Sequence, residues 1–333
     1  MRDTNLILVE GMPGTGKSTV SQFIHLQLRA VGRRSCWWHE ERHSHPLQLF
    51  YQPQRHATAA DYVEEAASLW QRFVDESRGQ HEVIVLDGSL FQNHVRSMLI
   101  HDCARQTMLA LVVKVAGLLR PLNPVLVYLR PLDVETNFRN VVDARGRRML
   151  DLWIEAHNHY PYTRRTKLNG YPGFIAFWKE FAEVADLAFD RLAIAKLAIN
   201  LSTGDWPAHY DRLLRFLDLP MSAASPSPQE LARFAGHYLP VNDEAACEFS
   251  LRVDGDHLVA TVDRPTIDVR RGPIGCFREV RLLPAGEDRF HVAAWPHVAQ
   301  FAADREGTIV NMRLDVSEIG WPQTCTVYAR APA

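Results

Sequence analysis

A glycine-rich segment close to the amino terminus carries the residues with the clearest chemistry. It reads Gly11-Met12-Pro13-Gly14-Thr15-Gly16-Lys17-Ser18-Thr19 and fits the pattern G-x-x-x-x-G-K-[ST]. Glycines let a backbone curl so that successive N–H groups point at one anion, while lysine adds a mobile positive charge and serine can ligate Mg²⁺. The pattern therefore predicts a loop that binds nucleotide phosphates, with Ser18 also a metal ligand. The predicted phosphate ligands are Gly11, Gly14, Thr15, Gly16, Lys17, Ser18 and Thr19.

An acidic residue lies at the end of an apolar run further along the chain. The run is Glu82-Val83-Ile84-Val85-Leu86-Asp87, and Gly88 follows it. In phosphate-transfer sites an aspartate at this kind of position holds Mg²⁺, directly or through water, or accepts a proton from the substrate. We therefore expect Asp87 to be a catalytic residue and a metal ligand. The alternative is an ordinary aspartate that begins a turn.

Arginines are concentrated between residues 139 and 148. Arg139, Arg145 and Arg148 follow the apolar run at 123–130 and lie in a helix-patterned stretch. Transfer of a phosphoryl group spreads negative charge over its oxygens, and arginines on a mobile lid can stabilise that charge. We expect Arg139 and Arg145 to act in catalysis and Arg148 to bind the nucleotide. A solvated basic helix face would have the same composition.

Over residues 1–219 the chain resembles the nucleoside and nucleotide kinases of the P-loop class, the thymidylate-kinase-like group. The matching segments are Val9 to Thr19, Leu86 to Ser89, the arginines that begin at Arg139, and Asn200 to Trp206. The resemblance implies ATP and Mg²⁺, a lid, and an acceptor hydroxyl or phosphate bound over the carboxyl edge of the sheet. Many deoxynucleoside kinases carry an arginine where this chain has Gly88, and Arg96 is the candidate to replace it.

The same resemblance directs attention to an acid after the second strand. In the family a carboxylate there often orients or deprotonates the acceptor, and this chain has Trp37-Trp38-His39-Glu40-Glu41. Parallel sheets gather their ligands at the carboxyl ends of their strands, which favours the same place. Glu40 is therefore the predicted base, with Glu41 as the alternative. Both could equally be surface residues of a polar loop.

The segment His39-Glu40-Glu41-Arg42-His43 also spells the zinc-protease pattern H-E-x-x-H. That pattern works on a helix, which places both histidines on one face. Here the segment follows a predicted strand, and Pro46 prevents a helix from extending. We therefore reject a zinc protease and expect these histidines to face an acceptor pocket or to lie in a plain loop.

Aromatic and basic residues are mixed between residues 157 and 174. The segment includes His157, Tyr160, Tyr162, Arg164 and Arg165. Rings beside cations could hold a nucleobase or a phosphorylated acceptor. Packing between helices, with a basic rim in solvent, would give the same composition and is slightly favoured.

Strand-like and helix-like segments alternate over residues 1–219 and predict an α/β fold. Strands are expected at 5–10, 35–39, 82–87, 123–130 and 196–201. Helices are expected at 17–31, 58–77 and 210–217, with a long helical stretch that ends near residue 119. The pattern indicates a five-stranded parallel sheet of the P-loop kinase type with helices on both faces.

A linker rich in proline and serine is expected at 220–228, followed by a second domain at 229–333. Short alternating runs at 247–253, 257–262, 279–283, 289–294 and 309–314, with glycine turns at 254–256 and 305–307, predict antiparallel β structure. This part resembles the small β domain appended to some serine-hydrolase-like proteins. The resemblance implies a lipocalin-like half-barrel that binds an apolar ligand, covers the kinase site or mediates pairing.

Composition narrows the range of partners. The chain has 333 residues, a net charge of -2 and five cysteines. A net charge this close to zero creates no positive potential over the whole protein that would attract nucleic acid. The wide spacing of the cysteines argues against a disulfide framework or a zinc knuckle. No segment has the pattern of a membrane span or a signal peptide. We expect a cytoplasmic protein with a small-molecule acceptor and without membrane or nucleic-acid partners, and a homodimer stays open.

These features together predict an ATP-dependent phosphotransferase that moves the γ-phosphoryl group to a small-molecule hydroxyl or phosphate. Nucleosides, nucleotides, sugars and antibiotics all stay open as acceptors. A nucleotide-hydrolysing binding protein or switch is the second hypothesis. A polynucleotide end kinase is the third hypothesis: the neutral charge balance disfavours it, whereas the local basic and aromatic stretch permits it. A sulfotransferase would share the sheet, but the intact lysine and serine of the loop favour a triphosphate.

Overall fold

A computed structural model describes most of the chain as two compact units. The described residues are 3–42, 45–50, 52–131, 133–200, 205–221, 226–242, 246–263, 265, 274–315 and 325–331. The first unit comprises residues 1–40, 44–138 and 151–222, and the second comprises residues 41–43, 139–150 and 223–333. Part of the predicted linker, residues 222–225, lies outside the described residues.

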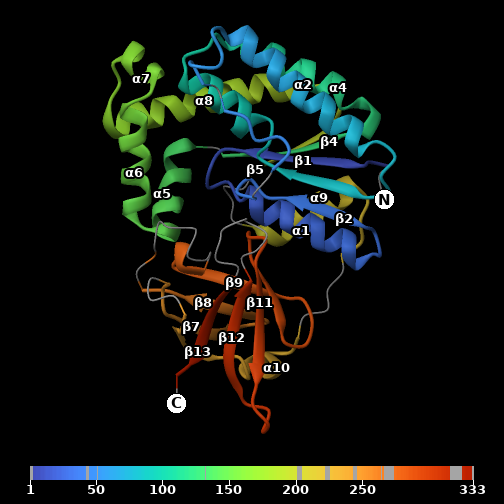
Figure 1. Cartoon of the computed structure of the whole chain (residues 1–333), viewed down its shortest axis with the longest axis vertical. Coiled ribbons are helices and arrows are strands. Elements are labelled where there is room, and N and C mark those ends of the chain that lie inside the picture. Colours follow the sequence, from blue (N-terminus) through green and yellow to red (C-terminus); the bar gives the residue numbers. More distant parts are fainter. Residues whose placement is uncertain are drawn as a thin grey trace. The chain divides into compact units, whose positions relative to one another are not determined.

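A parallel five-stranded sheet forms the centre of the first unit (Figure 1). Its strand order is β2-β3-β1-β4-β5, and every neighbouring pair runs parallel. The strands are β1 (Leu6–Gly11), β2 (Ser35–Trp38), β3 (Val83–Asp87), β4 (Val125–Arg130) and β5 (Ala195–Asn200). Each of the predicted strands is confirmed, with small shifts at its ends.

Helices cover both faces of this sheet. Alternate strand residues such as Ile7 and Val9 pack in one core with α1 (Lys17–Ala30) and α9 (Trp206–Leu217). The helices α2 (Ala59–Ser77), α4 (Arg105–Leu118) and α8 (Gly170–Arg191) lie on the opposite face (Figure 1). Strands buried on both sides need apolar residues at nearly every position, which is the pattern of β1 and β3. The predicted α/β fold of the P-loop kinase type is therefore confirmed.

Shorter helices make the connections. The π-helical turn η1 (Phe91–Val95) and α3 (Arg96–Ile100) follow β3, and η2 (Arg120–Leu122) precedes β4. Between β4 and α8 come α5 (Val134–Arg145), α6 (Arg147–Asn158) and α7 (Pro161–Thr166). Because the unit boundaries fall after residues 138 and 150, the end of α5 and the start of α6 belong to the second unit.

The carboxyl ends of the parallel strands lie at one edge of the sheet. β1 lies between β3 and β4, so the connections that follow these three strands begin next to one another at that edge and lead in different directions. Ligands of open parallel sheets bind in the crevice at such a switch point. Val9 pairs with Asp87 and Trp38 pairs with Leu86, so the ends of β1, β3 and β2 are level with one another.

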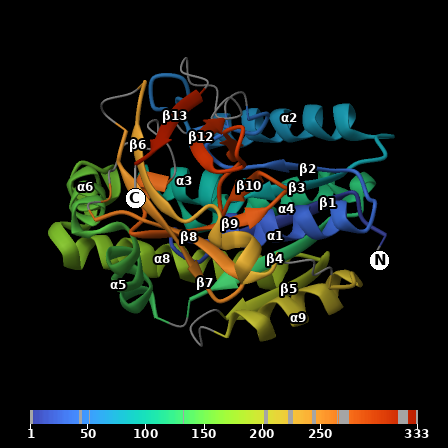
Figure 2. The same cartoon turned by 90° about the horizontal axis from the view of Figure 1, so that it is seen from below.

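The second unit contains a closed antiparallel barrel (Figures 1 and 2). Each strand pairs with the next along the chain, and the last strand pairs back with the first. The strands are β6 (Gly236–Pro240), β7 (Phe249–Asp254), β8 (His257–Thr261), β9 (Glu279–Pro284), β10 (Arg289–Val292), β11 (Val298–Ala303), β12 (Ile309–Asp315) and β13 (Cys325–Arg330). Antiparallel β structure was predicted correctly. The prediction of a half-barrel was wrong, because β13 pairs with β6 and closes the barrel.

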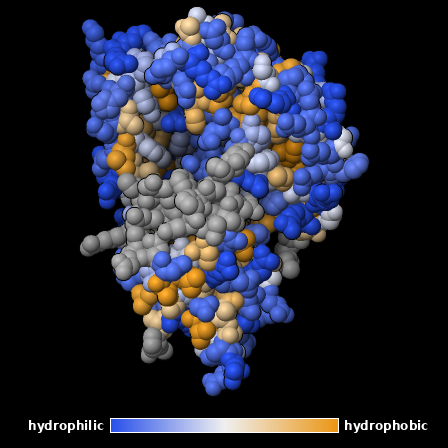
Figure 3. All heavy atoms as spheres, in the orientation of Figure 1, coloured by the Kyte–Doolittle hydropathy of each residue, from blue (hydrophilic) through white to orange (hydrophobic). Residues whose placement is uncertain are grey.

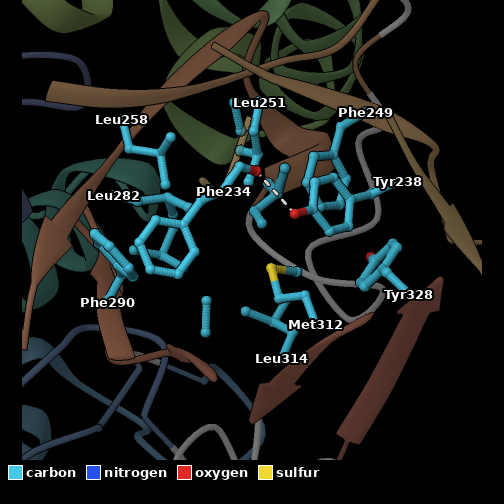
Figure 4. Close-up of a cluster of buried hydrophobic side chains, with 14 of the residues drawn as sticks. Phe234, Tyr238, Phe249, Leu251, Leu258, Leu282, Phe290, Met312, Leu314 and Tyr328 are labelled. Atoms are coloured by element: carbon cyan, nitrogen blue, oxygen red, sulfur yellow. Dashed lines mark hydrogen bonds between the residues drawn. The ribbon is translucent and has the colours of Figure 1, made fainter. Parts of the chain in front are cut away.

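Aromatic side chains form the core of the barrel (Figure 4). The rings of Tyr238 and Phe249 stack with their centroids 5.4 Å apart, and Tyr238 Oη donates to Phe234 O at 2.8 Å. Leu231 of the short helix α10 (Pro228–Ala232) is buried in the same cluster. An eight-stranded barrel is about wide enough for side chains to fill its interior. The barrel thus has a hydrophobic core of its own.

Polar side chains dominate the visible surface of the first unit, and apolar residues lie there in scattered patches (Figure 3). Phe50 and Leu187 are among the exposed large apolar residues. Within the described ranges, every helix is too short or too polar to cross a lipid bilayer.

Candidate functional site

The loop between β1 and α1 depends on its glycines. Gly11 has a φ of +156°, and a Cβ at this position would lie 2.6 Å from Thr15 Oγ1 and 2.7 Å from Leu129 O. Gly16, directly before α1, has a φ of +83° in the left-handed region. A larger residue would therefore be crowded out at the first position and strained at the second.

Hydrogen bonds fix the shape of this loop. The backbone N–H and the hydroxyl of Thr15 both donate to Met12 O, at 3.3 Å and 2.9 Å. Lys17 Nζ donates to the same oxygen at 3.3 Å, so the lysine folds back over the loop. Asn137 Nδ2 of α5 donates to Pro13 O at 2.8 Å. The loop is thus held by its own residues and by the first half of α5.

The first turn of α1 has the properties of an anion site. It contains no acidic residue, and no side chain of the described residues caps the amino end of this helix. The first N–H groups of a helix have no partner inside the helix, and the helix dipole adds partial positive charge there. Ser18 and Thr19 are partly exposed in this turn. The turn therefore fits the oxygens of a phosphate group.

Asp87 ends β3 with its carboxyl group fully buried. Neither of its oxygens has a hydrogen-bond partner within the described part of the chain. Burial raises the pKa of Asp87 well above its usual range, and the charge of Glu40 raises it further, while Lys17 and the Ser18 hydroxyl oppose the shift. A buried carboxylate without a partner is costly, and oxygen donors such as these suit Mg²⁺. Ser18 and Asp87 therefore lie near each other and fit the predicted metal site.

Glu40 lies two residues beyond the end of β2, at the level of Gly88. Gln92 Nε2 donates a hydrogen bond to Glu40 Oε2. A Cβ at Gly88, which has a φ of +63°, would lie 3.1 Å from Lys17 Cε and 3.2 Å from Glu40 Oε2. The structure thus brings together Lys17, Asp87 and Glu40, which the sequence places far apart. It also explains the glycine, since a larger side chain there would press on both the lysine and the glutamate.

Glu10 is a site residue that sequence reasoning did not assign a role. It is fully buried in β1, and its carboxylate accepts hydrogen bonds from Leu90 N at 2.7 Å, Phe91 N at 2.9 Å and Gln92 N at 3.4 Å. Burial raises the pKa of Glu10 to about 7, although these hydrogen bonds and Lys17 lower it. Glu10 therefore ties the strand before the loop to the turn after β3. An acid inside an otherwise apolar strand was the available signal.

Ser89 lies in the turn after β3, and Arg96 begins α3. Ser89 Oγ lies 3.4 Å from His45 Nε2, and Leu47 N donates to His45 Nδ1 at 3.1 Å. Because Nδ1 accepts, neutral His45 carries its proton on Nε2 and donates it to Ser89. Arg96 Cζ lies 6.0 Å from the centre of the Trp178 ring on α8. Replacement of the missing family arginine by Arg96 stays a prediction.

The three arginines that were predicted to lie in a lid all belong to the second unit. Arg139 and Arg148 are exposed, whereas Arg145 is half-buried with its Cζ 4.4 Å from the centre of the Phe277 ring. Their predicted contacts with the nucleotide stay predictions.

The zinc-protease pattern gains no support from the described residues. His39 is buried, with its ring edge-to-face against Trp37 at a centroid distance of 5.5 Å. His43 lies outside the described residues. Among those that the structure describes, no group of three metal-ligating side chains comes together. Glu41, the alternative base, is exposed and belongs to the second unit.

The mixed aromatic and basic segment is mainly a packing element. His157 and Tyr162 are buried, and the rings of both lie against Phe177 of α8, with centroid distances of 5.5 Å and 5.2 Å. Arg165 lies on the surface, where it pairs with Asp102. Helix packing with a basic rim, the favoured interpretation, accounts for these contacts. In the late loop that follows β5, residues 201–204 lie outside the described residues.

Comparisons with known proteins add little to this geometry. No protein family and no curated protein matches the sequence. Among solved structures, the chain is similar to a deoxyadenosine kinase from M. mycoides with bound dATP, at 15% identity and a TM-score of 0.37. The similarity covers 64% of this chain and 98% of that kinase. The fold assignment rests on the strand order, not on this similarity.

Proposed function

We propose that this protein is an ATP-dependent phosphotransferase that moves the γ-phosphoryl group to a hydroxyl or phosphate of a small molecule. One observation carries the proposal. A buried carboxyl group, Asp87, has no hydrogen-bond partner in the described structure and lies beside Lys17 and Ser18, at the start of a helix without a side-chain cap. A triphosphate with its divalent cation would satisfy all of these groups together.

The loop residues have distinct tasks in this proposal. Backbone N–H groups from Gly11 to Thr19 bind the phosphate oxygens, and Lys17 neutralises part of their charge. Ser18 and Asp87 hold the metal through oxygen atoms. When bound, Mg²⁺ supplies positive charge to the phosphate oxygens. Arg139 and Arg145 supply further positive charge to the transferred group, and Arg148 binds the nucleotide.

Glu40 is the proposed base in the transfer step. The acceptor oxygen forms a bond to the γ-phosphorus while the bond from that phosphorus to the β–γ bridging oxygen breaks, and ADP leaves. When the acceptor is a hydroxyl, its proton passes to the Glu40 carboxylate. The hydrogen bond from Gln92 Nε2 orients this carboxylate. Asp87, with a pKa raised by burial, is the second candidate to orient the acceptor.

A transfer screen tests the proposal. ATP labelled in its γ-phosphate is offered with nucleosides, nucleotides, sugars and aminoglycosides, and labelled products are separated. For the acceptor that is found, Lys17→Ala is expected to lower the transfer rate at least about 100-fold, because Lys17 stabilises developing charge. The matched control is Lys114→Ala, since this lysine pairs with Glu64 on the surface, and it should keep the wild-type rate. Both variants should show wild-type circular dichroism.

Other outcomes would redirect the assignment. Full-rate ATP hydrolysis without any labelled acceptor would favour a nucleotide-driven switch. Label on oligonucleotide ends, with steep salt dependence of binding, would favour a polynucleotide end kinase. Wild-type transfer by a well-folded Lys17→Ala protein would contradict the proposed role of the loop.

A further inference from the structure

The side chain of Gln92 lies directly beside the proposed base, and both residues belong to the first unit. Gln92 Nε2 donates a hydrogen bond to Glu40 Oε2. An ionised carboxylate can only accept hydrogen bonds, so the amide must turn its NH₂ group toward Glu40. Gln92 Oε1 is shielded from solvent and has no hydrogen-bond partner among the described residues. Gln92 therefore keeps one acceptor oxygen unused.

An unused acceptor of this kind is uncommon inside a protein. Most buried polar atoms are hydrogen-bonded, because burial removes the hydrogen bonds that water would otherwise make. In a candidate site, such an atom suits a ligand that brings the missing donor. An amide oxygen only accepts, so the donor must be an O–H or N–H group of that ligand.

The unused oxygen is a close neighbour of the base. Oε1 and Nε2 of Gln92 share one carbon atom, and Nε2 is bonded to Glu40. The Glu40 carboxylate and Gln92 Oε1 are therefore separated by only one hydrogen-bonded amide. A molecule whose reacting hydroxyl donates to Glu40 would bring its adjacent groups next to Gln92 Oε1. The two acceptors thus fit a ligand with two donor groups close together.

Gly88 determines which side chain comes to this place. A Cβ on residue 88 would lie 3.2 Å from Glu40 Oε2 and 3.5 Å from Gln92 Cβ. Many of the kinases that the sequence resembles carry an arginine at this position. Here the glycine leaves the space beside Glu40 to the uncharged amide of Gln92. The side chain that contacts the base at this point therefore brings no positive charge.

Three carboxyl groups and one lysine lie together around this point. Burial raises the pKa of Asp87, and the charges of Glu40 and Glu10 raise it further. The charge of Lys17 lowers the same pKa, so all of these side chains are close enough to interact. In the proposed function, Lys17 and the metal bind the triphosphate. A phosphate group as acceptor would need cations or donors of its own, whereas carboxylate and amide oxygens repel it.

We propose that the acceptor reacts through a hydroxyl group, not a phosphate, and carries a second hydrogen-bond donor beside that hydroxyl, which Gln92 Oε1 binds. This inference rests on the proposed phosphotransferase function and names its substrate class: an uncharged compound with neighbouring hydroxyl groups. The reacting hydroxyl gives its proton to Glu40 while its oxygen bonds to the γ-phosphorus and ADP leaves. Gln92 selects the acceptor, since a compound without the second donor leaves Oε1 unpaired.

Matched acceptors test the charge of the reacting group in the wild-type protein. Glycerol, ribose, glucose, myo-inositol and adenosine are each compared with their monophosphates, using ATP labelled in its γ-phosphate and Mg²⁺. We expect label on at least one uncharged compound. The kcat/KM for its monophosphate should be at least about 100-fold lower, because like charges at close range are strongly unfavourable. Faster transfer to the monophosphates would overturn the proposal.

Gln92→Leu tests the second donor. The acceptor that is found is compared with an analogue that lacks the hydroxyl nearest to the reacting one. Wild type should prefer the full acceptor by about 10-fold to 100-fold in kcat/KM, since the analogue leaves Gln92 Oε1 unpaired. In Gln92→Leu, which has no such oxygen, this preference should fall below about threefold. Misorientation of Glu40 would slow both compounds alike and would leave their ratio unchanged.

Gln71→Leu is the matched control, because Gln71 is exposed on α2, where its amide donates to Asp75. It should keep the wild-type preference. An undiminished preference in Gln92→Leu, or equal use of both compounds by wild type, would overturn the role of Gln92. The wild-type comparison needs no variant, so it decides the substrate class even if Gln92→Leu is unstable.

The same measurements separate this inference from the proposed function. Absence of label on every compound, with Mg²⁺-ATP still bound, would refute the proposed phosphotransferase, and this inference would fall with it. Label on phosphate groups alone would leave the phosphotransferase standing and would refute only the inferred substrate class.

Discussion

The two buried carboxyl groups near the loop meet different surroundings. Glu10 receives three backbone hydrogen bonds, whereas Asp87 has no hydrogen-bond partner among the described residues. Burial raises the pKa of both. The three hydrogen bonds offset the free-energy cost of burying the Glu10 carboxylate, so we interpret Glu10 as a residue that stabilises the fold. The missing compensation at Asp87 is what an external cation would supply.

Asp87→Asn tests this difference. The pKa of Asp87 is raised in the folded state, so the unfolded chain loses this proton first as pH rises above about 4. Rising pH therefore destabilises the folded wild type relative to the variant, by at most about 1.4 kcal/mol per pH unit. Urea unfolding of ligand-free protein at several values between pH 5 and pH 8 should show a difference that grows with pH in favour of Asp87→Asn.

Asp87→Asn should also bind ATP without the gain in affinity that we expect Mg²⁺ to give the wild type. Calorimetry with ATP should show Mg²⁺-dependent binding for wild type and a loss of that dependence for Asp87→Asn. A constant stability difference across the pH range, together with unchanged Mg²⁺ dependence, would contradict both the burial argument and the metal role.

Glu10→Gln tests the second acid. The amide keeps one acceptor oxygen but turns an NH₂ group toward backbone N–H groups that need acceptors. We expect the free energy of unfolding to fall by about 1–3 kcal/mol, the usual cost of an unsatisfied buried donor. Because Gln92 orients Glu40, kcat should also fall while the KM for ATP stays near wild type. Wild-type stability in urea would show that these hydrogen bonds are not needed.

Around the turn η1, one histidine joins three parts of the chain. Trp70 Nε1 donates to His94 Nε2 at 2.9 Å, and His94 Nδ1 lies 2.8 Å from Tyr62 Oη. Indole N–H can only donate, so the neutral histidine carries its proton on Nδ1 and gives it to Tyr62. Tyr62 Oη in turn donates to Leu49 O at 3.1 Å. The chain of bonds fastens the loop after β2 to α2 and η1.

This arrangement predicts a stability that depends on pH. Burial lowers the pKa of His94 to about 3, whereas in the unfolded chain it lies near 6.5. As pH falls below about 6.5, the unfolded chain takes up a proton that folded His94 refuses, so stability is lost between about pH 6.5 and pH 3. His94→Gln should remove up to about 1.4 kcal/mol per pH unit from the slope of unfolding free energy.

The slope, measured by urea unfolding between pH 4 and pH 6, is the informative quantity because the substitution also lowers stability at every pH. Surface His159→Gln is the matched control, since its side chain is exposed. An equal slope in wild type and His94→Gln would show that His94 titrates alike in the folded and unfolded states.

Closure of the barrel gives the second unit a core that does not depend on the sheet of the first. With β13 paired to β6, none of the described barrel strands has a free edge, which protects the barrel from pairing with other chains. Its buried cluster includes Phe249, which stacks on Tyr238 and lies edge-to-face against Tyr328.

Phe249→Ala should therefore act on the barrel alone. Removing a buried phenylalanine leaves a cavity and costs about 3–5 kcal/mol. We expect calorimetric scans to show a barrel transition at lower temperature, while Mg²⁺-dependent ATP binding, measured below that transition, keeps its wild-type affinity. A parallel loss of nucleotide affinity would mean that the loop depends on the barrel core for its shape.

The sequence by itself determined the glycine-rich turn between β1 and α1, the five strands of the sheet and the antiparallel nature of the second domain. These features depend on neighbours within a few residues: glycine spacing, apolar runs that end in polar residues, and alternation every second residue. The short strands β6, β11 and β13 were missed, since a brief alternating run is ambiguous until its partners are known. The glycine turn predicted at 254–256 is confirmed, since Asp254 pairs with His257 across it.

Only the tertiary structure decided how distant residues meet. Glu10 binds N–H groups 80 to 82 positions away, and Gln92 reaches Glu40 across 52 positions. Pairing of β13 with β6 turned an expected half-barrel into a closed one. The contact of Arg145 with Phe277 joined the end of α5 to the barrel. Burial and pairing over such separations depend on the packing of whole elements, which no local pattern encodes.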